Sequence, residues 1–147
     1  MQGRNLRTHL AAIAFAGLMA AASLPQAAHA SLETDILDRW YALLGAANAD
    51  GLGRLLAPRA KIKLDDLGLT QSKQEFLDSM AEWRDAIAGG SVRYRVQSTA
   101  AGRATALVCY HFKSNDMLTR ESFLIVAGLI TQSDQTKVAE DCGTLKQ

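Results

Sequence analysis

The side chains of this sequence best suited to acid–base or metal chemistry are one histidine and two cysteines. His111 is the only histidine after residue 30, and an imidazole can accept or donate a proton near neutral pH. Cys109 and Cys142 are the only cysteines of the chain. They lack the closely spaced ligand pairs of a typical zinc site, so we expect no metal and no cofactor. An acid–base role and an ordinary surface position both remain open for the histidine.

Residues 1–30 have the pattern of a secretory signal peptide. Arg4 and Arg7 make a positive start, residues 11–24 form an apolar run, and Ala28-His29-Ala30 is a small-x-small cleavage pattern. The apolar run is too short to cross a bilayer comfortably, and no second stretch of spanning length follows it. We therefore expect a periplasmic or secreted protein that is cleaved after Ala30 and is not inserted in the membrane afterwards.

Residues 31–147 have the size and charge of one small globular domain. Removing 30 of 147 residues leaves 117, enough for one hydrophobic core but not for two. The leader holds two of the 16 basic residues and none of the 15 acidic ones, so 14 basic residues remain against 15 acidic ones. No basic stripe stands out, so nucleic acid is not an expected partner. In an exported chain, an even number of cysteines favours a disulfide.

Helical patterns occupy the first half of this domain. Residues 32–47 carry apolar side chains at helical spacing, and a short second helix through residues 52–56 is expected to end at Pro58. Ser72 and Glu75 form a capping box at the start of a third helix, which a glycine pair at residues 89 and 90 closes. The sequence therefore predicts three N-terminal helices.

After Gly90 the apolar period changes to two, which is typical of β-strands. Turn dipeptides at Ala101-Gly102, Asn115-Asp116 and Ser133-Asp134 separate the later segments. The predicted strands are Lys61–Leu64, Val92–Thr99, Thr105–Lys113, Thr119–Thr131 and Gln135–Asp141. Helices followed by a meander of strands predict an α+β fold, with the helices packed on one face of an antiparallel sheet.

A tight turn at each dipeptide would also fix how the strands pair. It would place His111 opposite Arg120 and Tyr110 opposite Glu121, close to the end of a hairpin. It would also put Cys142 on the face of the sheet away from Cys109, too far for a disulfide. A disulfide would then require Cys142 to lie in a tail beyond the last strand that folds back, so the pairing of the cysteines stays open.

The order of the predicted elements resembles the nuclear-transport-factor-2-like superfamily, which includes ketosteroid isomerases and SnoaL-type polyketide cyclases. The segments that carry the resemblance are Trp40–Leu44, Asn48–Leu52, Ala60–Asp66, the capped helix from Ser72 and the strand Phe123–Ala127. The resemblance covers Ser31 to about Val138. It implies a cone-shaped α+β barrel, in which a curved antiparallel sheet wraps around the three helices and encloses a cavity.

The resemblance also implies catalytic positions. Isomerase-like members use a carboxylate at the end of the first strand as general base, where this chain has Asp65, or Leu64 if the match is shifted by one residue. Asp65 as an ordinary turn residue is the alternative. Tyr41 matches the expected hydrogen-bond donor on the first helix. No second acid is expected deep in the sheet, because Glu121 is placed beside Tyr110 near the rim.

Aromatic residues are the candidates for binding an apolar ligand in such a cavity. They are Trp40, Trp83, Tyr94, Tyr110 and Phe123. For each of them, packing in the core or on an outer sheet face that forms a homodimer is the alternative.

Three functions are compatible with these residues. We expect an exported cone-fold protein that binds a small apolar molecule or associates through its sheet. The alternative is an isomerase, cyclase or dehydratase in which Asp65 or His111 acts as acid–base and Tyr41 as donor. An accessory subunit that works through the exposed sheet is a third hypothesis.

Overall fold

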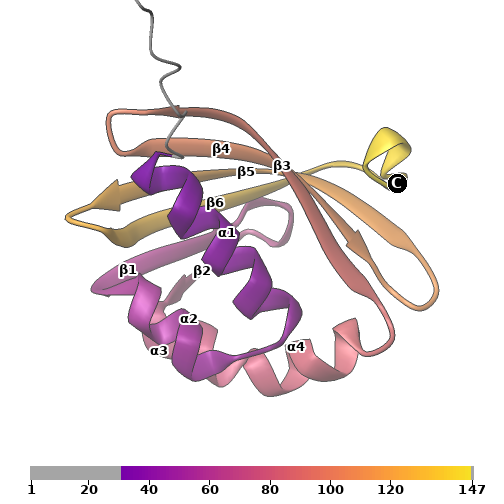
Figure 1. Cartoon of the computed structure of the whole chain (residues 1–147). Coiled ribbons are helices and arrows are strands. Elements are labelled where there is room, and N and C mark those ends of the chain that lie inside the picture. Colours follow the sequence, from indigo (N-terminus) through magenta and orange to yellow (C-terminus); the bar gives the residue numbers. More distant parts are fainter. Residues whose placement is uncertain (1–30, 147) are drawn as a thin grey trace, which may run out of the picture.

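The computed structural model describes residues 31–146, so the predicted signal peptide lies outside the described residues. The helices are α1 (Leu32–Gly45), α2 (Ala49–Leu55), α3 (Lys73–Asp78) and α4 (Met80–Ile87), with short 3-10 turns η1 (Asp65–Leu67) and η2 (Gly143–Lys146). The strands are β1 (Leu56–Leu64), β2 (Leu69–Ser72), β3 (Ser91–Ala100), β4 (Arg103–His111), β5 (Asp116–Val126) and β6 (Leu129–Ala139). Figure 1 shows the helices gathered on one side of a curved sheet, which confirms the predicted α+β class.

The sheet is mixed rather than purely antiparallel, and it does not close. Its strand order is β2-β1-β6-β5-β4-β3, so β2 and β3 are free edges of the described sheet. All neighbouring strands are antiparallel except β1 and β6, which run parallel. Strand β1 is longer than predicted and contains Pro58, which lies where the register between β1 and β6 shifts. Proline is tolerated there because an irregular stretch of strand needs no donor at every residue.

The predicted third helix is two helices. Its capping box is confirmed, because the Glu75 amide donates to the Ser72 hydroxyl and the Glu75 carboxylate accepts from the Ser72 amide. Ser79 then separates α3 from α4, and its hydroxyl donates to the carbonyl of Phe76 at 2.7 Å. Such a bond from serine to the preceding turn bends a helix. Within residues 31–146, no helix is long and apolar enough to cross a bilayer.

Two predicted turns are wrong in position. The β5–β6 hairpin turns at Ala127-Gly128, both with positive φ, so Ser133 and Asp134 lie inside β6. The β4–β5 connection spans residues 112–115, which pairs Tyr110 with Met117 and His111 with Asp116. This register differs from the predicted one by four residues. An even shift keeps each side chain on its predicted face, so Val108, Tyr110 and Phe123 still face the helices together.

The two cysteines form a disulfide, with 5.4 Å between their Cα atoms. Cys142 lies beyond the end of β6, in the tail that leads into η2, and this tail packs against β3 and β4. The fold-back that a disulfide required is therefore present. Both cysteines are buried, so the bond fixes the C-terminal tail to the outer face of the sheet.

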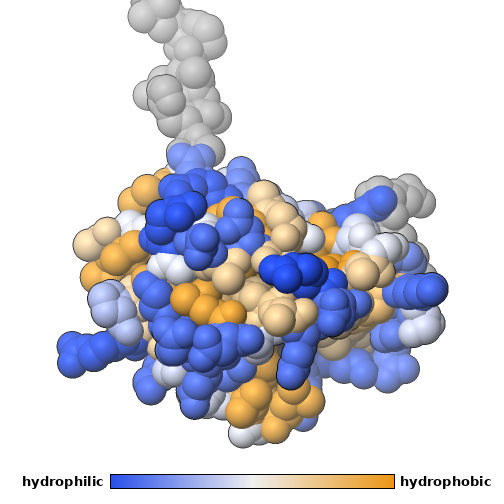
Figure 2. Space-filling model, turned by 90° about the horizontal axis from the view of Figure 1, so that it is seen from below, coloured by the Kyte–Doolittle hydropathy of each residue, from blue (hydrophilic) through white to orange (hydrophobic). Residues whose placement is uncertain are grey.

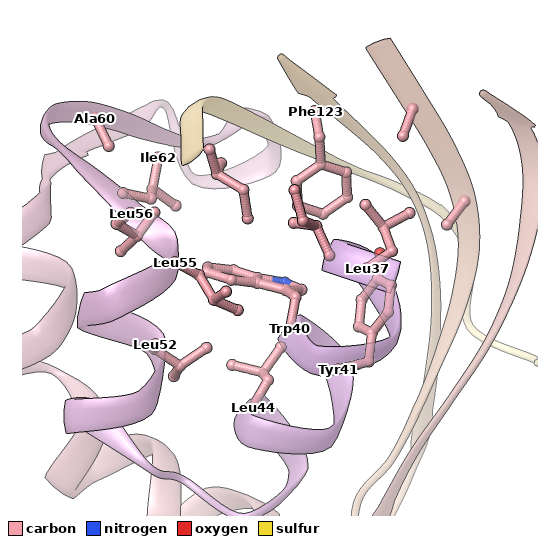
Figure 3. Packing of buried hydrophobic residues seen from close by; sticks show 14 of the residues in the cluster. Leu37, Trp40, Tyr41, Leu44, Leu52, Leu55, Leu56, Ala60, Ile62 and Phe123 are labelled. Atoms are coloured by element: carbon pink, nitrogen blue, oxygen red, sulfur yellow. The ribbon is translucent and has the colours of Figure 1, made fainter. Parts of the chain in front are cut away.

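The hydrophobic core lies between α1, α2 and the concave face of the sheet. Figure 3 shows the Trp40 indole lying across its middle, with Leu52, Leu55 and Leu56 on one side and Phe123 on the other. Trp40 also stacks on Phe76, with 5.5 Å between ring centroids. On the face seen in Figure 2, hydrophobic residues gather in several small patches separated by hydrophilic ones.

Candidate functional site

A cavity of about 530 Å³ opens between α4, η1 and the concave side of the sheet. Its volume lies in the range of small-molecule sites, roughly 300–1,000 Å³. Apolar and aromatic residues make most of its lining: Trp40, Leu44, Ile62, Leu64, Leu67, Phe76, Met80, Trp83, Tyr110 and Met117. Polar residues complete it: Asp66, Gln71, Ser79, Glu121, Ser133, Gln135 and Lys137. The cavity therefore offers an apolar surface with a few polar groups.

Glu121 is the only buried carboxyl group among the described residues that line this cavity. It lies in the middle of β5, opposite Ala106 on one side and Gln135 on the other, and it is 3% exposed. Three hydroxyl groups donate hydrogen bonds to its carboxyl. Tyr41 of α1 donates at 3.0 Å, Tyr110 of β4 at 2.6 Å and Thr119 of β5 at 3.0 Å. Three elements thus hold one acid in a fixed position.

Burial raises the pKa of the Glu121 carboxyl, and the hydrogen bonds from Tyr110, Tyr41 and Thr119 oppose that rise without cancelling it. Burial and the proximity of Glu121 raise the pKa of both Tyr110 and Tyr41. The tyrosines therefore stay neutral donors. Glu121 keeps its proton to higher pH than an exposed glutamate, so this group can hold or release a proton inside an apolar cavity.

The placement of Glu121 corrects the prediction that it lies near the rim. The predicted contact between Tyr110 and Glu121 is present, but the two are not cross-strand partners. Tyr110 pairs with Met117, and its long side chain reaches along the sheet to the carboxyl. The acid that Tyr41 was expected to lack is also Glu121. Sequence reasoning missed it because the assumed turn put the hairpin end two residues closer to Glu121 along β5 and placed Glu121 opposite Tyr110 instead of Ala106.

Asp65 lies in η1, outside the deep part of the cavity. It is exposed, accepts a hydrogen bond from the Thr136 hydroxyl at 2.7 Å and lies 3.9 Å from the Lys63 ammonium. Asp66 accepts from the backbone amide of Lys137 at 2.5 Å and lines the cavity. These bonds tie η1 to β6. A general-base role for Asp65 remains a prediction.

His111 lies on the other face of the sheet from the cavity. Its Nδ1 is 2.5 Å from a carboxylate oxygen of Asp116, and its side chain is 58% exposed. It borders a small outer pocket of about 220 Å³ with Ser91, Arg93 and Cys109. The structure therefore does not bring His111 together with Tyr41 or Asp65, and its predicted neighbour Arg120 pairs with Leu107 instead.

Three of the five aromatic candidates line the cavity, namely Trp40, Trp83 and Tyr110. The Trp83 indole N–H donates to the Leu44 carbonyl at 2.7 Å, which fixes the ring against the end of α1. Tyr94 instead stacks on Tyr41 with 4.3 Å between centroids. Phe123 packs in the core against Trp40 and Tyr41. Tyr94 and Phe123 therefore do not line the cavity but pack against Tyr41, which bonds Glu121.

Solved structures share this fold. A provisionally assigned ketosteroid isomerase from Kribbella flavida matches at 13% identity and a TM-score of 0.62, over 74% of this chain and 78% of that chain. A hypothetical protein from Catenulispora acidiphila with a ketosteroid isomerase-like fold was crystallised in complex with trimethylamine. It matches at 18% identity and a TM-score of 0.61, over 69% of this chain and 84% of that chain. A provisionally assigned polyketide cyclase from Streptomyces antibioticus matches at 14% identity and a TM-score of 0.55, over 70% of this chain and 89% of that chain.

At these identities the likeness defines the fold and not the activity. The fold is the nuclear-transport-factor-2-like cone, as the order of the sequence elements predicted. No protein-family model and no curated protein sequence matches the chain.

Proposed function

We propose that this protein binds a small, largely apolar molecule in the cone cavity. The observation that carries the proposal is the combination of a 530 Å³ cavity, apolar walls and one buried acid with its three hydroxyl donors. A few convergent polar groups in an apolar pocket are typical of small-molecule sites. The apolar walls would supply affinity, and Glu121 with Tyr110 would orient the ligand.

A neutral fluorescent probe, N-phenyl-1-naphthylamine, tests this proposal. Its fluorescence is expected to rise saturably with one molecule bound per chain. Met117 lines the cavity from β5 and is partly buried. Met117→Trp should fill part of the cavity and weaken binding about tenfold or more, which corresponds to about 1.4 kcal/mol.

The matched control is Leu118→Trp, one residue along the same strand and therefore on the opposite face of the sheet. It should bind the probe as the unchanged protein does. No saturable binding by the unchanged protein, or equal weakening by the two tryptophan variants when both are folded by circular dichroism, would contradict the proposal.

A second candidate function is an acid–base enzyme of the isomerase or cyclase kind, and the buried Glu121 favours it. A carboxyl whose pKa is raised by burial can donate its proton to a bound substrate and take it back. In this version Glu121 replaces Asp65 and His111 in the acid–base role, and Tyr41 and Tyr110 hold it. A stereospecific exchange of substrate hydrogen with deuterium oxide, lost in Glu121→Gln, would distinguish an enzyme from a simple binding protein.

We further propose that the chain is exported and cleaved after Ala30. The leader pattern supports this, and so does the Cys109–Cys142 disulfide, since disulfides persist mainly in oxidising compartments. The intact mass of the protein recovered from the periplasm or medium should correspond to a chain that begins at Ser31. Ala30→Arg should block the cleavage and leave the leader attached. A chain of full mass in the cytoplasm would contradict export.

A further inference from the structure

The hydrogen bonds around Glu121 suit an anion. A carboxylate has about four acceptor positions and no donor, and three of them receive hydroxyl groups here. Hydrogen bonds from neutral donors to a charged acceptor are about twice as strong as those to a neutral one. A protonated carboxyl would instead need an acceptor for its own proton, and all three neighbours are directed at it as donors. The three donors thus favour the carboxylate form of Glu121, against the burial that raises its pKa.

What Glu121 lacks is a positive partner. None of the ion pairs within residues 31–146 involves Glu121. Lys137 is the only lysine or arginine among the described residues that line the cavity, and its ammonium donates to Glu140 at 2.8 Å. A buried carboxylate without a counter-charge is costly by several kcal/mol. Within the described residues no cation is placed beside Glu121, so a positive ligand would supply the counter-charge that its carboxylate form lacks.

The walls beside Glu121 suit a cation that carries apolar groups. Tyr110, which bonds Glu121, meets Trp83 edge to face with 5.5 Å between centroids, and both line the cavity. Phe76 and Trp40 supply further rings, stacked on each other. Aromatic faces attract cations, most strongly where water is excluded. Met80 and Met117 add soft, polarisable surface to the same wall.

We propose that the ligand of this cavity is an ammonium ion with apolar substituents, whose positive nitrogen lies beside the Glu121 carboxylate and the aromatic wall. This inference rests on the proposed ligand-binding function and names its ligand class. The positive charge supplies the counter-charge that Glu121 lacks, and the apolar substituents fill the remaining volume. When such an ammonium binds to the protonated protein, the Glu121 proton leaves to solvent and an ion pair remains in the cavity.

The other titratable groups that face Glu121 do not supply this proton. Tyr41 from α1 and Tyr110 from β4 hold their protons, because burial raises the pKa of each. The neighbour from β6 is Gln135, which does not titrate. Asp66 and Lys137 are the remaining charged residues that line the cavity, and both are exposed.

A pair of probes of matched shape tests the inference by displacement of N-phenyl-1-naphthylamine. They are 2-naphthylmethylamine, which is an ammonium ion at neutral pH, and 2-naphthalenemethanol, which is uncharged. We expect the amine to bind about tenfold or more tightly than the alcohol. Glu121→Gln should remove this preference. Asp85→Asn, which removes the same charge from the exposed surface of α4, should keep it.

Proton release provides a measurement that needs no variant. Calorimetric titration of the unchanged protein in two buffers of different ionisation enthalpy, repeated at decreasing pH, should show proton release with the amine that increases as the pH falls, and none with the alcohol. Equal affinity for the two probes, or a preference that survives in Glu121→Gln, would overturn the inference. If the fluorescent probe still binds the cavity in that case, the ligand-binding function stands and only the ligand class is wrong.

Discussion

Replacement of Cys109 and Cys142 by alanine is expected to lower the free energy of unfolding by about 4 kcal/mol. The two cysteines are 33 residues apart in sequence, and closing a loop of that length in the unfolded chain accounts for about this stabilisation. Urea unfolding followed by tryptophan fluorescence measures it. The double variant should also free η2, which packs against β3 and β4 through the tail that the disulfide holds.

The unchanged protein after full reduction is the control for this experiment. It should lose about the same free energy as the double variant, since the two lack the same covalent bond. A double variant within about 1 kcal/mol of the oxidised protein would show that the disulfide contributes little.

Replacement of Glu121 by leucine is expected to destabilise the protein by about 3 kcal/mol or more. The hydroxyls of Tyr41 and Tyr110 would lose the acceptor that they now share, and a buried polar group left without a partner costs about 1–3 kcal/mol. Thr119 keeps a weaker acceptor, the Val108 carbonyl at 3.5 Å. Chemical denaturation at neutral pH measures the loss.

The matched variant combines Glu121→Leu with Tyr41→Phe and Tyr110→Phe, and it should regain much of the lost stability because no tyrosine hydroxyl is left without an acceptor.

The Glu121→Gln variant adds a test by pH. The folded-state pKa of Glu121 lies above its ordinary value of 4.5, so between these two pKa values the folded protein binds more protons than the unfolded chain. The free energy of unfolding therefore falls as the pH rises from 4.5 through the folded-state pKa. Glutamine does not titrate, so the unchanged protein should lose stability relative to Glu121→Gln over the same window. Unchanged stability of Glu121→Leu would contradict the account.

Local patterns in the sequence predicted those parts of the fold that local physics decides. The Ser72–Glu75 capping box and the helical stripe around Trp40 were both correct, because each depends on residues within one or two turns of helix. The faces of β4 and β5 were also correct, since the register between them shifted by an even number of residues and side chains alternate. The break at Ser79 was missed, because serine tolerates a helix interior as well as a bend.

The site could be predicted only in part, because it depends on strand register. Tyr41 and Tyr110 were both identified, and so was their neighbour Glu121, but the depth of Glu121 was wrong. The turn is centred between residues 113 and 114 instead of at Asn115-Asp116, which moved β5 by four residues against β4 and carried Glu121 from the rim to the centre of the sheet. The position of a turn is weakly encoded in a segment such as Lys113-Ser114-Asn115, where several turn types are compatible with the residues.

The disulfide depended on the same uncertainty. With the last turn placed at Ser133-Asp134, the final strand would have carried Cys142 along the wrong face. With the turn at Ala127-Gly128, the strand ends at Ala139 and leaves Cys142 in a free tail. Three residues then suffice for the chain to reach Cys109. Only the register in space, and not the number of cysteines, decided between the two outcomes.

The most direct test of the central claim is the position of a bound apolar ligand. Amide and indole chemical shifts of the ¹⁵N-labelled protein, recorded during titration with N-phenyl-1-naphthylamine, locate it. The account predicts that the largest changes occur at the cavity residues Trp83, Met117 and Glu121. Changes confined to the outer face, around His111 and Arg93, would contradict it.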